Sequence, residues 1–152
     1  MKYNKALVWN YLLLFIRLWL GYRMFTASYS SVTGMITSSS EREFFQKWFG
    51  EELHFPMPLA MAFLAKSAEL AGGIFLFFGL FSKKAALLIA FTMFIATVTA
   101  NLGKDFNIDG GFTISYFLFA LIFILWGAGK FSLDYLLFEK NKFKDSNYPL
   151  IA

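Results

Sequence analysis

One stretch of the sequence decides the fold of this chain: LAMAFLAKSAELAGGIFLFFGLF, from Leu59 to Phe81. It is long and apolar, yet Glu69 stands near its middle. A second apolar run, from Ala6 to Ala27, carries Arg17 near its centre. At a rise of about 1.5 Å per residue, each charge lies roughly 15 Å from the ends of its run, which is about the midplane of a bilayer core. An ionisable group there costs at least about 2.5 kcal/mol, so Arg17 and Glu69 are candidates to meet.

The composition of the whole chain agrees with a membrane protein. Of 152 residues, 58% are hydrophobic and 16% charged, whereas soluble domains average about 25% charged residues. The mean hydropathy is +0.55. We therefore expect one all-α domain over residues 1–152, an integral membrane four-helix bundle with spans at about 6–27, 59–81, 85–102 and 112–128 and a cytoplasmic tail at 129–152.

The first apolar run has some features of a signal peptide. Lys2 and Lys5 precede it, and the segment 26–28 resembles a weak cleavage site. A signal core is purely apolar and about 7 to 15 residues long, whereas this run is longer and contains Arg17 and Arg23. We expect a helix that is retained in the mature protein.

The distribution of charges predicts the orientation. Lysines flank the ends of the spans on one side, and acidic residues dominate the connections on the other side. By the positive-inside rule both termini are cytoplasmic, in a multi-pass protein of a bacterial-type inner (plasma) membrane. The net charge of +4 then reflects topology, and we find no basic, base-reading face that would bind nucleic acid.

The connection from Ser28 to Pro58 contains an amphipathic stretch. The pattern Ser40-Glu41-Arg42-Glu43 predicts a capping box with Ser40 as N-cap, and aromatic residues recur behind it at helical spacing. Such a helix either lies on the outer membrane surface or forms a lid over an outward-facing cavity. Pro56 and Pro58 should end this segment and begin the second span.

Several kinds of chemistry find no support in the sequence. The chain has no Cys and a single His, His54, so thiolate metal sites, dithiol relays and a bis-histidine haem are excluded. We predict no metal site, no covalent cofactor and no nucleotide site, because the paired glycines lie in an apolar helix or a tight connection. A redox cofactor would be dissociable and membrane-soluble, such as a quinone.

The polar residues near the outer ends of the predicted helices suggest a site. Gly21 and Gly73 should let the first two spans approach closely. Glu69 has two possible cations, Arg17 and Lys66, the latter on its own helix face. We predict an outward-facing, positively biased vestibule that ends at Arg17 and Glu69, with the polar residues Tyr22, Arg23, Lys66, Thr97, Thr99, Asn101 and Lys104. The alternative is that the charges only fix helix register and that the polar residues serve a loop.

Three motifs in order carry a family resemblance: Arg17-Leu-Trp-Leu-Gly21, Ala68-Glu-Leu-Ala-Gly-Gly73 with Gly79-Leu-Phe81, and Gly127-Ala-Gly-Lys-Phe-Ser-Leu-Asp134. The chain resembles the DoxX family over nearly its whole length. The resemblance implies a small four-helix inner-membrane protein, related to the DoxD-type subunit of thiosulfate:quinone oxidoreductase and to partners in oxidant-detoxification complexes. It also implies Arg17 and Glu69 as the intramembrane charges. Family members often have a His where this chain has Asn101.

Two functions follow from these features. In the first, the protein is the membrane component of a quinone-linked redox or oxidant-detoxification complex, in which Arg17 stabilises the reduced quinone and Glu69 transfers a proton. Lys66, Arg23, Tyr22, Asn101 and Lys104 would line the ligand site, and electrons would come from another membrane or periplasmic subunit. In the second, it is a non-enzymatic scaffold whose charge pair is structural.

Overall fold

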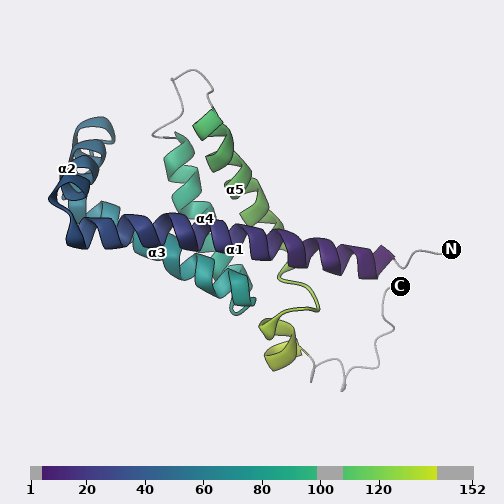
Figure 1. Ribbon diagram of the computed structural model, residues 1–152. Coiled ribbons are helices and arrows are strands. Elements are labelled where there is room, and N and C mark those ends of the chain that lie inside the picture. Colours follow the sequence, from purple (N-terminus) through teal and green to yellow (C-terminus); the bar gives the residue numbers. More distant parts are fainter. Residues whose placement is uncertain (1–4, 99–107, 140–152) are drawn as a thin grey trace.

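The structure is a computed structural model that describes residues 5–98 and 108–139 (Figure 1). Within these residues the chain is helical and contains no strand. The elements are α1 (Lys5–Thr37), α2 (Ser39–Lys47), the π-helical segment η1 (Trp48–Glu52), α3 (Pro58–Phe78), α4 (Ser82–Ala96), α5 (Ile108–Trp126) and a second π-helical segment, η3 (Tyr135–Glu139).

Helices α1 and α3 pack with their backbones in contact. A Cβ placed on Gly21 would lie 2.8 Å from the Phe77 backbone, and one on Gly73 would lie 2.8 Å from the Phe25 nitrogen. No side chain fits at these distances, so glycine is required at both positions. The predicted close approach of the first two long helices is confirmed. Gly72 lies on the face of α3 that packs on α4, and a Cβ placed on it would lie 2.9 Å from the Ile89 side chain.

Helices α4 and α5 form a hairpin that packs on α3 and crosses α1 (Figure 1). Leu20, Leu76, Ile89 and Phe123 are fully buried at the centre of the core, one from each of the long helices. The turn between α3 and α4 contains Gly79 at φ 69°, a left-handed conformation that ends α3 three residues before the predicted Phe81.

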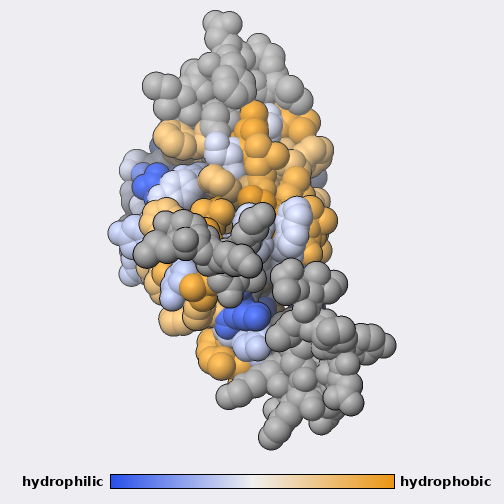
Figure 2. Space-filling view, turned by 90° about the vertical axis from the view of Figure 1, so that its right-hand side faces the viewer, coloured by the Kyte–Doolittle hydropathy of each residue, from blue (hydrophilic) through white to orange (hydrophobic). Residues whose placement is uncertain are grey.

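The outer surface of these helices is apolar. Exposed fractions reach 69% for Phe15 and 66% for Leu125, and each long helix carries further exposed aromatic or aliphatic residues. Figure 2 shows such side chains over much of the coloured surface on one face. Within the described part of the chain, α3 is the one helix whose length and apolar composition both suffice to cross a bilayer.

Helix α1 is longer than predicted. It continues past Ala27 to Thr37, so the predicted loop from Ser28 begins with ten helical residues and the segment 26–28 lies inside the helix. The hydroxyls of Ser31, Thr33 and Thr37 donate to carbonyls four residues earlier in the same helix. These bonds satisfy the polar side chains locally, which is why a polar composition did not end the helix.

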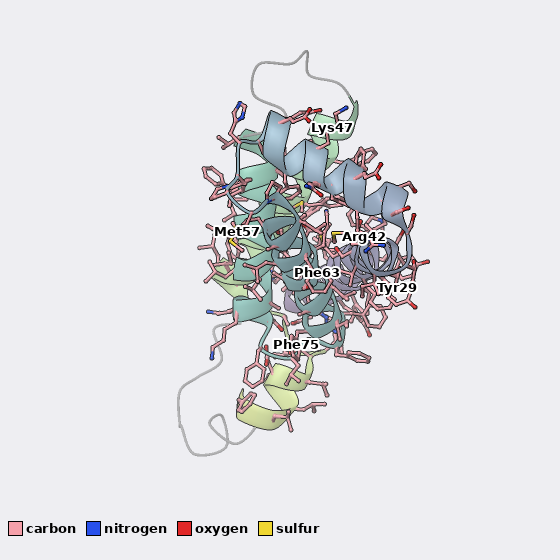
Figure 3. All side chains as sticks on the ribbon, turned by 90° about the vertical axis from the view of Figure 1, so that its left-hand side faces the viewer. Tyr29, Arg42, Lys47, Met57, Phe63 and Phe75 are labelled. Atoms are coloured by element: carbon pink, nitrogen blue, oxygen red, sulfur yellow. The ribbon has the colours of Figure 1, made fainter. Side chains whose placement is uncertain are left out.

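Helix α2 lies across the ends of α1 and α3, with Arg42 and Lys47 on it (Figure 3). The prediction of Ser40 as its N-cap is wrong: Ser38 has this role, and its hydroxyl accepts from the Glu41 backbone N–H at 3.5 Å. Ser38 and Glu41 have the same spacing as the predicted pair, so the sequence pattern fits both positions. Pro58 starts α3, as predicted.

Candidate functional site

Glu69 is a buried carboxylate, 4% exposed, at the middle of α3. Its Oε2 atom accepts hydrogen bonds from Lys66 Nζ and from Ser28 Oγ, both at 2.9 Å. Lys66 precedes Glu69 by one helical turn, and Ser28 reaches it from α1. The cation beside Glu69 is therefore Lys66, and the carboxylate also links the two helices.

An apolar cavity of about 500 Å³ lies beside this ion pair, and we call it the Glu69 cavity. Its walls come from the connection after α2, from α3 and from α4. Lys66 and Glu69 are its charged lining residues. The hydroxyl of Thr92, another lining residue, donates to main-chain carbonyls of its own helix. The aromatic part of the wall is formed by Trp48, Phe49, Phe55 and Phe91. This arrangement suits an apolar ligand with one polar end.

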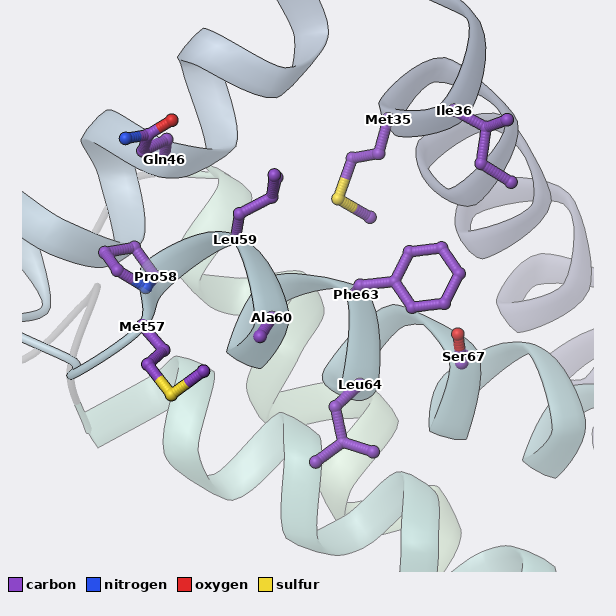
Figure 4. A pocket seen from close by; sticks show the side chains of 10 residues that line it. All are labelled: Met35, Ile36, Gln46, Met57, Pro58, Leu59, Ala60, Phe63, Leu64 and Ser67. Atoms are coloured by element: carbon purple, nitrogen blue, oxygen red, sulfur yellow. The ribbon is translucent and has the colours of Figure 1, made fainter.

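A second, larger space lies between α1, α2 and α3, and we call it the open groove. It has a volume of about 980 Å³, and Met35 of α1 and Phe63 of α3 extend into it (Figure 4). Gln46 and Ser67 are its polar side chains, and its lining includes no charged residue. Leu64 borders both the open groove and the Glu69 cavity. Of these two spaces, the Glu69 cavity is the one that combines apolar walls with groups that can exchange a proton.

Arg17 does not meet Glu69, so the expected pair between them is wrong. Arg17 is 3% exposed, and its guanidinium donates to the main-chain carbonyls of Ala128 at 3.2 Å and Phe131 at 2.8 Å. Both acceptors lie in the segment after α5. Every residue has a main-chain carbonyl, so a sequence pattern cannot show which carbonyls accept from Arg17. For that reason the sequence suggested a carboxylate as the partner of Arg17.

The surroundings of Arg17 form a compact unit, which we call the Arg17 junction: Arg17, Gly79, Ala128, Phe131 and Asp134. A Cβ on Gly79 would lie 2.5 Å from Arg17 Nη1. The Asp134 backbone N–H donates to the Gly79 carbonyl at 2.8 Å. The Asp134 carboxylate accepts the backbone N–H groups of Phe81 and Ser82, each at 2.7 Å, at the start of α4. The described part of the predicted tail thus packs on the helices.

The other predicted ligand residues do not share one site. Tyr22 is exposed and borders a small groove between α1 and α3. Arg23 Nε donates to Tyr116 Oη at 3.4 Å, and Thr97 bonds to Thr113. Thr99, Asn101 and Lys104 lie outside the described residues. Among the described residues, the predicted vestibule is replaced by the apolar Glu69 cavity, and only Lys66 and Glu69 of the predicted set line it.

Several residues of the site were missed by sequence reasoning. The sequence predicts Ser28 as the first residue of a loop, whereas in the structure it is fully buried and bonded to Glu69. For the segment with Trp48 and Phe49, the sequence allows a helix on the membrane surface or a lid over a cavity. In the structure both residues line the Glu69 cavity, which agrees with the lid. Their close spacing with Phe44 and Phe45 was the available signal. His54 is exposed, and the described residues contain no cluster of three metal-ligating side chains.

Comparison with known proteins gives a family and one informative relative. The DoxX family model matches residues 12–102, a range that contains every residue lining the Glu69 cavity. A protein of Bacillus subtilis (strain 168) named "Putative oxidoreductase CatD" is 30% identical over 86 residues, which are 57% of this chain and 64% of that protein, so the alignment covers less than two thirds of the relative. No solved structure matches the chain. The chain belongs to the DoxX family.

Proposed function

We propose that this protein is a multi-pass protein of a bacterial-type inner membrane, with both termini cytoplasmic. Three observations support this location. The outer surface of the long helices is apolar, α3 is long and apolar enough to span, and membership of the DoxX family agrees. Buried polar groups such as Ser28 and Glu69 inside and apolar groups outside are the pattern of a protein whose solvent is lipid.

Within that membrane we propose that the protein binds a quinone in the Glu69 cavity, as the membrane component of a quinone-linked redox or oxidant-detoxification complex. The observation that carries this proposal is the Lys66–Glu69 ion pair, with its 2.9 Å contact, on the wall of an apolar cavity of about 500 Å³. A quinone has an apolar body and carbonyl oxygens that need a donor. The cavity volume is in the ordinary range for small-molecule sites.

The residues of the cavity have separable tasks in this proposal. A bound quinone supplies chemistry in which two electrons and two protons are taken up together. Lys66 Nζ is the donor available to a quinone oxygen and stabilises negative charge there. Glu69 holds or releases a proton at its carboxylate, and the Ser28 hydroxyl at 2.9 Å extends this path into α1. The aromatic walls exclude water, which strengthens these polar contacts.

The electrons come from a partner protein in this proposal. The chain has no Cys for a thiol relay, so a separate membrane or periplasmic subunit is the donor. The name of the Bacillus subtilis relative supports an oxidoreductase role. This support comes from the aligned region, which is 57% of this chain.

A second candidate is a non-enzymatic scaffold in which the buried charges are structural. The Arg17 junction favours it, because two nitrogens of the guanidinium, Nη1 and Nη2, tie the segment after α5 to α1. In the same way, Glu69 joins Ser28 of α1 to Lys66 of α3. Under this alternative the Glu69 cavity has no resident ligand, and partners bind elsewhere on the surface.

The test is the quinone content and quinone binding of protein purified in mild detergent. We compare wild type with Glu69→Gln and Lys66→Gln, which keep size and polarity but remove charge. Glu43→Gln is the matched control, since Glu43 is exposed on α2. We expect near-stoichiometric quinone in wild type and in the control, and at least a tenfold weaker affinity for a quinone analogue in both cavity variants.

The outcomes separate the two candidates. Loss of quinone with an unchanged unfolding midpoint supports the redox proposal and locates its site. Absence of quinone and of analogue binding in wild type, together with a lower unfolding midpoint for Glu69→Gln, supports the scaffold. Equal quinone binding by all four proteins contradicts the assignment of the ligand to the Glu69 cavity.

A further inference from the structure

A third cavity lies at the opposite end of the long helices from the Glu69 cavity. It has a volume of about 400 Å³, and we call it the lysine cavity. It opens where the α3–α4 turn, the start of α4 and the segment after α5 meet. Three lysines line it, Lys83 and Lys84 from α4 and Lys130 from that segment, and Asp134 is its acidic lining residue.

The charges of this cavity favour an anion. Both Asp134 oxygens accept backbone N–H groups at 2.7 Å, so this carboxylate is engaged with the positive end of α4. The lysines remain as an excess of positive charge around one concave space. Ser82 is another lining residue of this cavity, and its hydroxyl is buried without a hydrogen-bond partner among the described residues. Because Ser82 has no exposed surface, its hydroxyl lies behind the cavity wall, and the lysines are the groups that meet an anion in this space.

Fixed geometry brings the lysines together. A Cβ on Gly127 would lie 3.6 Å from Lys83 Cε, so the Lys83 stem runs along this glycine. Lys84 Nζ lies 5.5 Å from the centre of the Phe81 ring. The Lys130 backbone N–H donates to Asn10 Oδ1 at 2.9 Å, which attaches the segment after α5 to α1. The lysines therefore extend from elements that are held in place.

The remaining wall is apolar and open to the outside. Trp126 is 60% exposed, Phe138 50% and Phe81 47%, and all three line the lysine cavity. Tryptophan beside lysine is typical of the boundary between headgroups and hydrocarbon. Basic pockets between helices on the cytoplasmic side of a membrane bind anionic headgroups.

We propose that the lysine cavity binds the phosphate of an anionic phospholipid, with the headgroup between the lysines and the acyl chains along Trp126 and Phe138. This site is independent of the Glu69 cavity and of any quinone. It rests on the proposed membrane location, which membrane fractionation tests separately. A free phosphate ion offers the same chemistry, and the exposed aromatic wall favours the lipid.

The experiment measures lipid binding by native mass spectrometry and the unfolding midpoint in mixed micelles. The probes are phosphatidylglycerol, phosphatidylcholine of the same acyl chains, and inorganic phosphate. The double variant Lys83→Gln with Lys130→Gln removes two cavity charges. Its matched control is Arg42→Gln with Lys47→Gln, which removes two exposed charges from α2. We expect one tightly held phosphatidylglycerol on wild type and control, and about thirty-fold weaker binding by the cavity variant.

The result that overturns the proposal is equal retention of phosphatidylglycerol by the cavity variant and the control, or equal retention of phosphatidylcholine by wild type. A stabilisation by inorganic phosphate that matches that of the lipid assigns the site to a free anion and contradicts the lipid. Circular dichroism verifies that the cavity variant is folded. If it is not, Lys83→Gln alone replaces it, with Lys47→Gln as control and about fivefold weaker binding expected.

Discussion

Arg17 and Glu69 are buried to nearly the same extent, with exposed fractions of 3% and 4%, but their surroundings differ completely. Arg17 donates to two main-chain carbonyls and lines none of the described cavities. Glu69 shares its Oε2 atom between two side chains and faces an apolar cavity. Depth in the protein therefore does not assign a role to a charge. The kind of partner and the presence of a cavity beside the charge are better guides, and on these grounds we propose a structural role for Arg17 and a functional role for Glu69.

The largest expected effect is the loss of the Arg17 junction. Arg17→Met leaves the carbonyls of Ala128 and Phe131 without their donors, and we expect a loss of about 3 kcal/mol in the free energy of unfolding. Denaturant titration in mixed micelles measures it. Arg42→Met, on the exposed side of α2, should change stability by less than about 0.5 kcal/mol. A stable Arg17→Met protein that has lost quinone binding would reverse our assignment of the two charges.

The second effect concerns the glycine contact that brings α1 and α3 together. In Gly73→Ala the new methyl group meets the Phe25 nitrogen at 2.8 Å, and we expect a loss of about 2 kcal/mol. The control is Gly34→Ala, another helical glycine, whose methyl group meets the flexible Glu41 side chain at 3.1 Å. This control should be neutral or more stable, because Ala favours helices. Equal changes in stability in the two variants would show that the close backbone contact at Gly73 does not set the effect.

The helices and the contact between α1 and α3 could be predicted from the sequence, because apolar length and paired glycines report on them directly. The end of α1 could not, since its last turns are polar and Ser31 and Thr33 bond within the helix. At the site, the i,i+3 spacing of Lys66 and Glu69 already gave one of the two possible pairs. The partners of Arg17 could not be predicted, because they are carbonyls more than a hundred residues away.

The third effect concerns the cap of α4 at the Arg17 junction. Asp134→Asn keeps one acceptor oxygen and loses the other, together with the charge near the helix start. We expect a loss of about 1 kcal/mol, seen as a lower unfolding midpoint. Glu51→Gln, in an exposed position after α2, is the control and should unfold like wild type. An unchanged midpoint for Asp134→Asn would mean that water replaces this cap without cost.

A smaller effect on stability is expected at the cavity itself. In Glu69→Gln the amide oxygen still accepts from Ser28 and Lys66, so the free energy of unfolding should fall by less than about 1 kcal/mol. Quinone binding should fall at least tenfold in the same protein. This ratio of a small stability effect to a large binding effect is opposite to that expected for Arg17→Met. A loss of stability as large as that of Arg17→Met would put Glu69 in the same structural class.

The smallest expected quantity is the coupling energy between the two charges. Arg17 shares neither of the partners described for Glu69, and Ser28, which bonds to Glu69, lies about 16 Å further along α1 than Arg17. In a double-mutant cycle of Arg17→Met and Glu69→Gln, the stability losses should add to within about 0.5 kcal/mol. For the same reason, the exchange Arg17→Glu with Glu69→Arg should not restore stability, because each new charge meets the wrong partners. A coupling energy above about 1 kcal/mol would show that Arg17 and Glu69 stabilise the protein together. The main role of Glu69 would then be to hold α1 and α3 in place, and not to bind a ligand.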